Sequence, residues 1–206
     1  MVNYYVQTDA DAPEPRLSIT PGITGRHFLY KAAINPLPAG LVRTLVSYTR
    51  TQVQTWPLRP FQIGLMDERQ LEEPARAAFR GLRALLPPIL RDGAAGLVVC
   101  EQMAAHNDPD YAGYAFASVV LATGAQPYLI QLFQSQVDST GALELASSAC
   151  AMHTGDCVIF DPMTPHMVAP LRPADDQLLV MLQVEVPGGT SDKREHLLAD
   201  LPPVSN

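Results

Sequence analysis

Residues 141–168 read GALELASSACAMHTGDCVIFDPMTPHMV, and the pattern of runs and turns in this segment indicates the fold class. It contains two short apolar or alternating runs, residues 141–152 and 155–162, and a third run begins at His166. His-Thr-Gly-Asp separates the first two runs, and Asp-Pro ends the second. Short strands divided by glycine and proline turns are typical of a β-sandwich or barrel.

The same pattern extends to both sides of this stretch, from Gly93 to about residue 186. Turn signals such as DPDYAG, TGAQP, DSTG and PADD separate the apolar runs. The seven runs are residues 96–106, 114–124, 126–135, 141–152, 155–162, 166–171 and 177–186. So many short strands in one half of the chain predict an all-β sandwich or barrel there.

The part before Gly93 has a different period. Two strands are expected first, NYYVQ at residues 3–7 and HFLYKAAI at residues 27–34. Residues 35–56 then repeat apolar side chains at roughly helical spacing, at Leu41, Leu45, Tyr48 and Val53. This spacing predicts an amphipathic helix.

A second helix is predicted from about Asp67 to residue 90. Its acidic residues come early and its arginines late, an order that complements the helix dipole. Pro74 falls inside the stretch, so the continuous helix is expected to start there, and Pro87-Pro88 disturbs its end.

Length predicts a single domain over residues 1–206. We expect an N-terminal extension with helices at 1–92, a β core at 93–186 and a tail at 187–206. A chain of this size buries roughly 70% of its unfolded surface, so it needs no disulfide or structural metal to fold.

Composition argues against several classes of partner. The net charge is −7 and the chain has no basic run, which disfavours nucleic acid and acidic membranes as partners. The N-terminus shows no signal peptide, and no apolar run is long enough to span a bilayer, so we expect a cytoplasmic protein. The three cysteines lack CxxC spacing, and buried thiols are expected at Cys100 and Cys157.

Two of the five histidines belong to a pattern that suits a metal ion. His106 and Asp108 are two residues apart, so they point to the same side if they share one strand. His166 lies on a later run, 60 residues on. Two histidines and one carboxylate can occupy one face of an octahedral ion, as in non-haem Fe(II) sites with open positions.

These segments resemble a known family. HNDPDYAGYAFASVVLATG at residues 106–124, followed by residues 138–168, is similar to the Fe(II)/2-oxoglutarate-dependent dioxygenase superfamily, especially its prolyl-hydroxylase-like branch. INPLPAGLVRTLVSYTR at residues 34–50 also resembles the helix that usually opens that domain. The resemblance implies a mainly β fold with N-terminal helices packed on the larger sheet of a double-stranded β-helix, or jelly roll.

The resemblance also implies a chemistry. His106, Asp108 and His166 match the metal ligands, which would be the catalytic residues holding Fe(II), with 2-oxoglutarate as co-substrate and O2 as oxidant. Oxidative decarboxylation of 2-oxoglutarate would accompany hydroxylation or a similar oxidation of a small molecule or an amino-acid side chain. A carboxylate at Asp108 fills the position that halide takes in related halogenases, so chlorination is not expected.

The sequence departs from the family at one position. An arginine usually follows the distal histidine by about ten residues and binds the far carboxylate of 2-oxoglutarate, but here Asp176 and Gln177 follow His166 at that distance. The nearest cation is Arg172, which we predict as the anchor, and Tyr128 and Gln131 are predicted to contact the same carboxylate.

The missing arginine leaves alternatives open. A cation from another strand could hold the co-substrate, or 2-oxoglutarate is not used. In the second case the chain is a cupin-like metalloenzyme on the same architecture, either an isomerase or a cofactor-free oxygenase. A non-catalytic jelly-roll binding domain is the third alternative. The substrate and the oligomeric state are not predicted.

Overall fold

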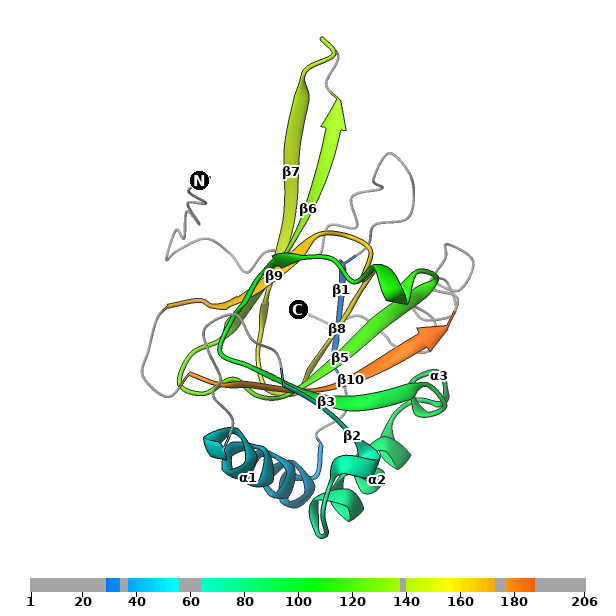
Figure 1. Cartoon of the computed structure of the whole chain (residues 1–206), viewed down its shortest axis with the longest axis vertical. Helices are drawn as coiled ribbons and strands as arrows, with labels where there is room; N and C mark the ends of the chain where they lie inside the picture. Colours follow the sequence, from blue (N-terminus) through cyan, green and yellow to red (C-terminus); the bar gives the residue numbers. More distant parts are fainter. Residues whose placement is uncertain (1–28, 34–36, 56–63, 138–139, 173–176, 188–206) are drawn as a thin grey trace.

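The computed structural model describes residues 29–33, 37–55, 64–137, 140–172 and 177–187. Strand residues dominate this part of the chain, and helices precede most of them (Figure 1). No helix in these ranges has the length and apolar character that crossing a bilayer requires. The expected strand at residues 3–7 and the tail from residue 188 lie outside the described residues.

Within the described ranges, ten strands form two antiparallel sheets. The large sheet has the order β1-β8-β5-β10-β3-β2 and the small sheet the order β4-β9-β6-β7. The strands of the large sheet are β1 (Leu29–Ala33), β2 (Gly64–Asp67), β3 (Ala94–Cys100), β5 (Tyr114–Ala122), β8 (Asp156–Phe160) and β10 (Leu179–Pro187). The strands of the small sheet are β4 (Met103–His106), β6 (Tyr128–Val137), β7 (Leu143–Met152) and β9 (His166–Pro170). The predicted jelly roll is confirmed.

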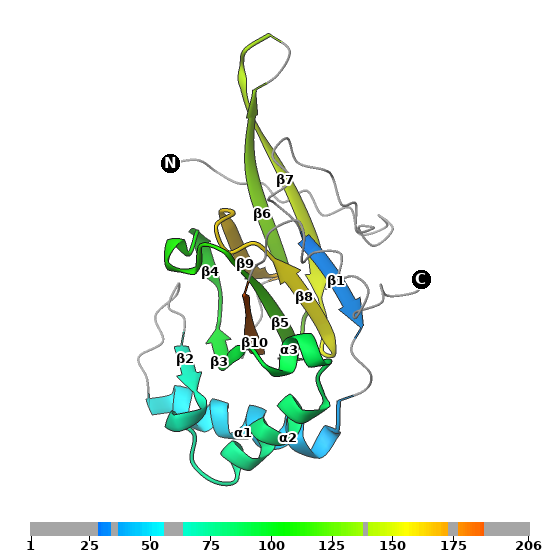
Figure 2. The ribbon, with the colours of Figure 1, turned by 90° about the vertical axis from the view of Figure 1, so that its right-hand side faces the viewer.

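The chain alternates between the two sheets. β5 and β8 lie in the large sheet, whereas β4, β6, β7 and β9 lie in the small one. Apart from the pairs β2–β3 and β6–β7, the paired strands are distant in sequence. The hairpin of β6 and β7 continues beyond the rest of the small sheet, as Figures 1 and 2 both show.

The helices cover the outer face of the large sheet (Figures 1 and 2). They are α1 (Ala39–Thr55), α2 (Ala75–Leu85) and α3 (Pro88–Arg91), with short 3-10 turns η1 (Glu68–Gln70) and η2 (Pro109–Tyr111). Leu45 of α1 and Phe79 of α2 are fully buried, in one cluster with Val119 and Leu182 of the sheet. The predicted packing of N-terminal helices on the larger sheet is confirmed.

A second core lies between the sheets. It includes Val98 and Val158 of the large sheet and Ile130 and Val168 of the small one. Strand alternation explains the division, because neighbouring residues such as Val158 and Ile159 belong to different cores. The large sheet is therefore apolar on both faces, and its inner face is available to form a site.

Two predicted elements differ from the structure. The run at residues 96–106 is two strands, β3 and β4, which belong to different sheets. The second helix does not start at Asp67, because this residue ends β2 and its carboxylate caps η1, accepting a hydrogen bond from Arg69 N at 2.7 Å. The continuous helix begins at Ala75, directly after Pro74, as the proline predicted.

Strand β2 has no counterpart among the predictions. Its four residues, GLMD, form no long apolar run, and the strand exists because β3 offers it a free edge. Propensity within so short a segment does not predict a strand whose pairing is supplied from elsewhere in the chain.

Candidate metal centre

The two histidines of the sequence motif are neighbours on adjacent strands. His106 ends β4 and His166 begins β9, and the antiparallel register of these strands places them opposite each other. Their ring centroids are 4.5 Å apart. The pairing of two strands 60 residues apart thus brings both imidazoles to the same edge of the small sheet.

Asp108 lies beside both histidines, although it is not part of the strand. β4 ends at His106, and Asp108 precedes the η2 turn with φ −114° and ψ 79°. The expectation that His106 and Asp108 share one strand is therefore wrong. The chain leaves the sheet here because Pro109 follows, and the Asp108 N–H donates to Pro162 O at 2.9 Å.

The Asp108 carboxylate nevertheless faces both imidazoles. Asp108 Oδ1 is 3.8 Å from His106 Nε2, and Asp108 Oδ2 is 3.6 Å from His166 Nε2. The three ligand atoms lie within 4.8 Å of one another, which makes this a cluster of three potential metal ligands. The structure thus brings together all three residues that the sequence predicted as ligands.

Backbone carbonyls orient both histidine rings. His106 Nδ1 donates to Ala104 O at 2.7 Å, and His166 Nδ1 donates to Thr164 O at 2.9 Å. A carbonyl only accepts, so the proton of each neutral ring is on Nδ1 and the Nε2 lone pair points toward Asp108. Hydrogen bonds of this kind orient metal-binding histidines in many proteins.

The donor set fits a divalent transition metal. Two ligand atoms each about 2.1 Å from one ion are at most about 4.2 Å apart. The two N–O distances, which join different oxygens of Asp108, fall below that limit, and one ligand atom from each of the three residues lies within 4.8 Å of the others. Burial lowers the pKa of His166. The hydrogen bond to the Thr164 carbonyl and the charge of Asp108 oppose this shift, whereas His106 adds to it, and the neutral, ligating form of His166 is favoured. Two imidazoles and one carboxylate on one side leave the other positions of an octahedral ion open.

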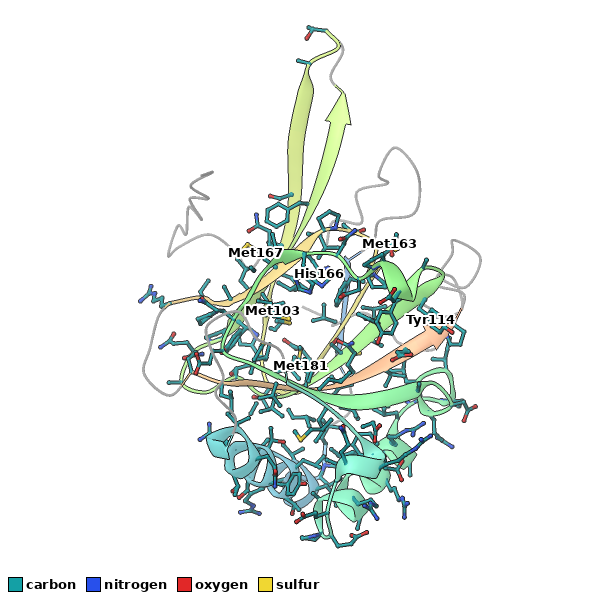
Figure 3. The ribbon with its side chains drawn as sticks, in the orientation of Figure 1. Met103, Tyr114, Met163, His166, Met167 and Met181 are labelled. Atoms are coloured by element: carbon teal, nitrogen blue, oxygen red, sulfur yellow. The ribbon has the colours of Figure 1, made fainter. Side chains whose placement is uncertain are left out.

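The cluster borders a cavity between the sheets of about 120 Å³. In Figure 3, His166, Met103 and Met181, which line this cavity, lie nearer the centre of the molecule than Met163 and Tyr114. Most of the lining is apolar, and both sheets contribute to it. The lining residues are Leu65, Val98, Met103, His106, Asp108, Tyr111, Phe116, Ser118, Ile130, Met152, Val158, Phe160, His166, Val168, Met181 and Gln183.

A series of aromatic rings connects the cluster with the surface. The Phe160 ring centroid is 4.7 Å from that of His166 and 5.8 Å from that of Phe116. Tyr111 follows at 4.8 Å from Phe116, and the exposed Tyr114 follows at 6.4 Å from Tyr111. Of these rings, Phe160 packs on the His166 imidazole, and His166 is buried.

The three residues predicted to contact a co-substrate carboxylate do not line this cavity. Tyr128 is buried in the core between the sheets and donates its hydroxyl to Glu101 O at 2.9 Å. Gln131 donates to Ser147 Oγ at 3.0 Å on the other face of β6, and Arg172 is exposed after β9. Their role in binding a co-substrate remains a prediction.

The polar residues of the opposite wall, Ser118 and Gln183, were not predicted from the sequence. Both are single polar residues inside apolar strands, in ASVV and LQVEV. Their only signal is strand parity: Ser118 and Gln183 alternate with Ala117 and Leu182, which face the helices.

Several solved structures are similar to this chain. SnoK, a non-heme alpha-ketoglutarate-dependent carbocyclase from nogalamycin biosynthesis, aligns over 88% of this chain and 90% of its own, with 12% identity and a TM-score of 0.50. A prolyl-4-hydroxylase from Pseudomonas putida aligns over 78% and 93%, with 21% identity and a TM-score of 0.45. An oxalate decarboxylase from Bacillus subtilis aligns over 63% of this chain and 26% of its own, with 14% identity and a TM-score of 0.34.

No protein-family model matches the sequence, and no curated protein matches it. The similarity to SnoK concerns the fold, which agrees with the predicted jelly roll. What the site does is inferred from its own residues.

Proposed function

We propose that this protein is a mononuclear iron oxygenase that uses a 2-oxo acid, 2-oxoglutarate in the first instance, to oxidise a small molecule or an amino-acid side chain. One observation carries the proposal: His106, Asp108 and His166 converge at the edge of an apolar cavity between the two sheets. Fe(II) bound there would supply activation of O2 and oxidation of an otherwise unreactive C–H bond.

The protein's own part is to hold and shield the ion. His106 and His166 present Nε2 because the backbone fixes their Nδ1 protons. Asp108 adds one negative charge, so a divalent ion keeps a net positive charge that attracts an anionic 2-oxo acid. The apolar lining keeps bulk water away from the open side of the site.

The dimensions of the cavity limit the ligand. At about 120 Å³ it is smaller than the usual pocket for a drug-sized molecule, about 300 Å³ or more. It therefore suits a small acid or one end of a substrate, with the remainder of the substrate outside. The net charge of −7 disfavours a nucleic-acid substrate.

A cupin-like metalloenzyme that needs no 2-oxo acid is the second candidate. One observation favours it: among the described residues that line the cavity, none is a lysine or an arginine. The carboxylate of 2-oxoglutarate that lies away from the metal would then have no cation to pair with among these lining residues.

Anaerobic titration with Fe(II) and 2-oxoglutarate tests the proposal. We expect one equivalent of Fe(II) to bind, and 2-oxoglutarate then to produce the weak visible charge-transfer band of its bidentate complex. Iron binding without the band, under saturating 2-oxoglutarate, would support the second candidate. Absence of iron binding would refute both.

A further inference from the structure

The wall of the cavity opposite the small sheet contains one neutral polar pair. Ser118 of β5 and Gln183 of β10 are directly opposite in the antiparallel register, and Ser118 Oγ donates to Gln183 Oε1 at 3.3 Å. Both side chains line the cavity. Apart from this pair, the three potential metal ligands and Tyr111, the lining residues that the structure describes are apolar.

The bond to Ser118 determines which atoms of Gln183 are available. A carboxamide has one acceptor oxygen and two N–H donors. The oxygen is engaged by Ser118, so the Nε2 donors remain for another acceptor. No hydrogen bond from Nε2 is found to the part of the chain that the structure describes. An N–H in an apolar wall gains most when a ligand brings an oxygen to it.

The pair of Ser118 and Gln183 lines the same cavity as the three potential metal ligands. The Phe160 ring packs on His166, and Phe160 is paired in register with Phe116. Ser118 is two residues farther along β5, about 7 Å at the usual rise of a strand. A ligand that contacts a metal held by these three residues at one end can thus extend along the large-sheet wall toward Ser118.

We infer that the Gln183 carboxamide, held by Ser118, anchors the far end of the 2-oxo acid by a neutral hydrogen bond, in place of a cation. This inference rests on the proposed function. Its consequence is a selectivity that a cationic anchor does not give: an uncharged oxygen at the far end of the acid binds about as well as a carboxylate.

Three probes of similar size measure this selectivity in protein loaded with Mn(II). They are 2-oxoglutarate, its 5-methyl ester, and 2-oxopentanoate, which has no oxygen at the far end. Isothermal titration calorimetry is expected to give dissociation constants for the first two within about fivefold, and binding of 2-oxopentanoate roughly tenfold weaker, the usual effect of one hydrogen bond. A preference of roughly 100-fold for the dicarboxylate over both neutral probes would reveal a cation and overturn the inference.

Substitution of Gln183 gives a second, independent measurement. Gln183→Glu keeps the shape but places a carboxylate at the anchor, so the ester is expected to bind more tightly than 2-oxoglutarate. Gln183→Leu is expected to weaken both by roughly tenfold and to leave 2-oxopentanoate unchanged. Mn(II) affinity is expected to stay within about twofold of the parent protein in both variants, because Gln183 is not one of the metal ligands. Unchanged selectivity in Gln183→Glu would overturn the inference.

Gln131→Leu and Arg172→Met locate the anchor. Gln131 is also a strand glutamine paired with a serine, but on the opposite face of its sheet. A loss of 2-oxoglutarate binding in either of these variants, with none in Gln183→Leu, would place the anchor at the residue that the sequence predicted and overturn the inference.

The failures of the two proposals are distinguishable. If one equivalent of Mn(II) or Fe(II) does not bind, the metal function fails and the anchor falls with it. If the metal binds and none of the three acids does, the metal centre stands, while the use of a 2-oxo acid and the Gln183 anchor are both refuted.

Discussion

The two walls of the cavity differ in chemistry and in origin. The small-sheet wall carries the two histidines, with Asp108 beside them, and its charges are concentrated in one cluster. The large-sheet wall is apolar except for the neutral pair Ser118 and Gln183. One sheet can thus hold a metal while the other holds the acid proposed to bind that metal. The following predictions test whether the two walls act independently.

The largest effect is expected at the ligand cluster. Asp108→Ala removes one of three ligands and leaves the histidines without a carboxylate, so affinity for Mn(II) should fall by more than the roughly 100-fold that loss of an outer-shell partner can cost. Calorimetric titration of the metal measures it. Asp110→Ala, an exposed acid two residues on, is the matched control and should bind Mn(II) as the parent does. Equal affinity in Asp108→Ala would remove the cluster from consideration as a metal centre.

The second effect is expected on the large-sheet wall. Val158→Phe fills part of a cavity of about 120 Å³, so 2-oxoglutarate should bind roughly tenfold more weakly or not at all while Mn(II) still binds. Ile159→Phe makes a similar change on the other face, in the helix-covered core, where overpacking should cost about 1–3 kcal/mol of stability and leave ligand binding intact. Loss of metal binding in Val158→Phe would show that the walls are not independent.

A third, smaller effect concerns pH and the metal-free protein. Burial holds the folded-state pKa of His166 below its ordinary value of 6.5. Below pH 6.5 the unfolded chain binds a proton that the folded chain does not, so the free energy of unfolding should fall as the pH drops, by at most about 1.4 kcal/mol per unit. Above pH 6.5 this contribution is complete. Urea unfolding between pH 7.5 and 5 measures the slope, and His166→Gln should reduce it; an identical slope would contradict the assignment.

The smallest effect is expected for two buried thiols on opposite faces of the large sheet. Cys100 belongs to the core between the sheets and Cys157 to the helix-covered core. Burial is the main cause that raises the pKa of each thiol to about 12. A nearby carboxylate adds to the shift, Glu101 for Cys100 and Asp156 for Cys157. Neither should react with a thiol reagent at pH 8 until the protein unfolds. Rapid labelling of Cys100→Ala protein at Cys157 would indicate that the helix layer opens.

Much of the fold was predictable from local pattern. The strands after Gly93 alternate or form apolar runs bounded by turn residues, and the helix at residues 39–55 repeats apolar side chains at helical spacing. The predictions were wrong where pairing is non-local. β2 is a strand because β3 has a free edge, and the run at residues 96–106 divides between two sheets, which no local period reveals.

The sequence alone determined which side chains could bind a metal, because histidines are few and His106, Asp108 and His166 follow a recognisable order. Only the tertiary structure decided how they meet: β4 and β9 pair, and Asp108 returns to them from outside the strand. It also decided the opposite wall, where Ser118 and Gln183, 65 residues apart, become neighbours through strand register. A short motif lies within one segment, whereas a wall is assembled from strands whose partners are set by the packing of the whole sheet.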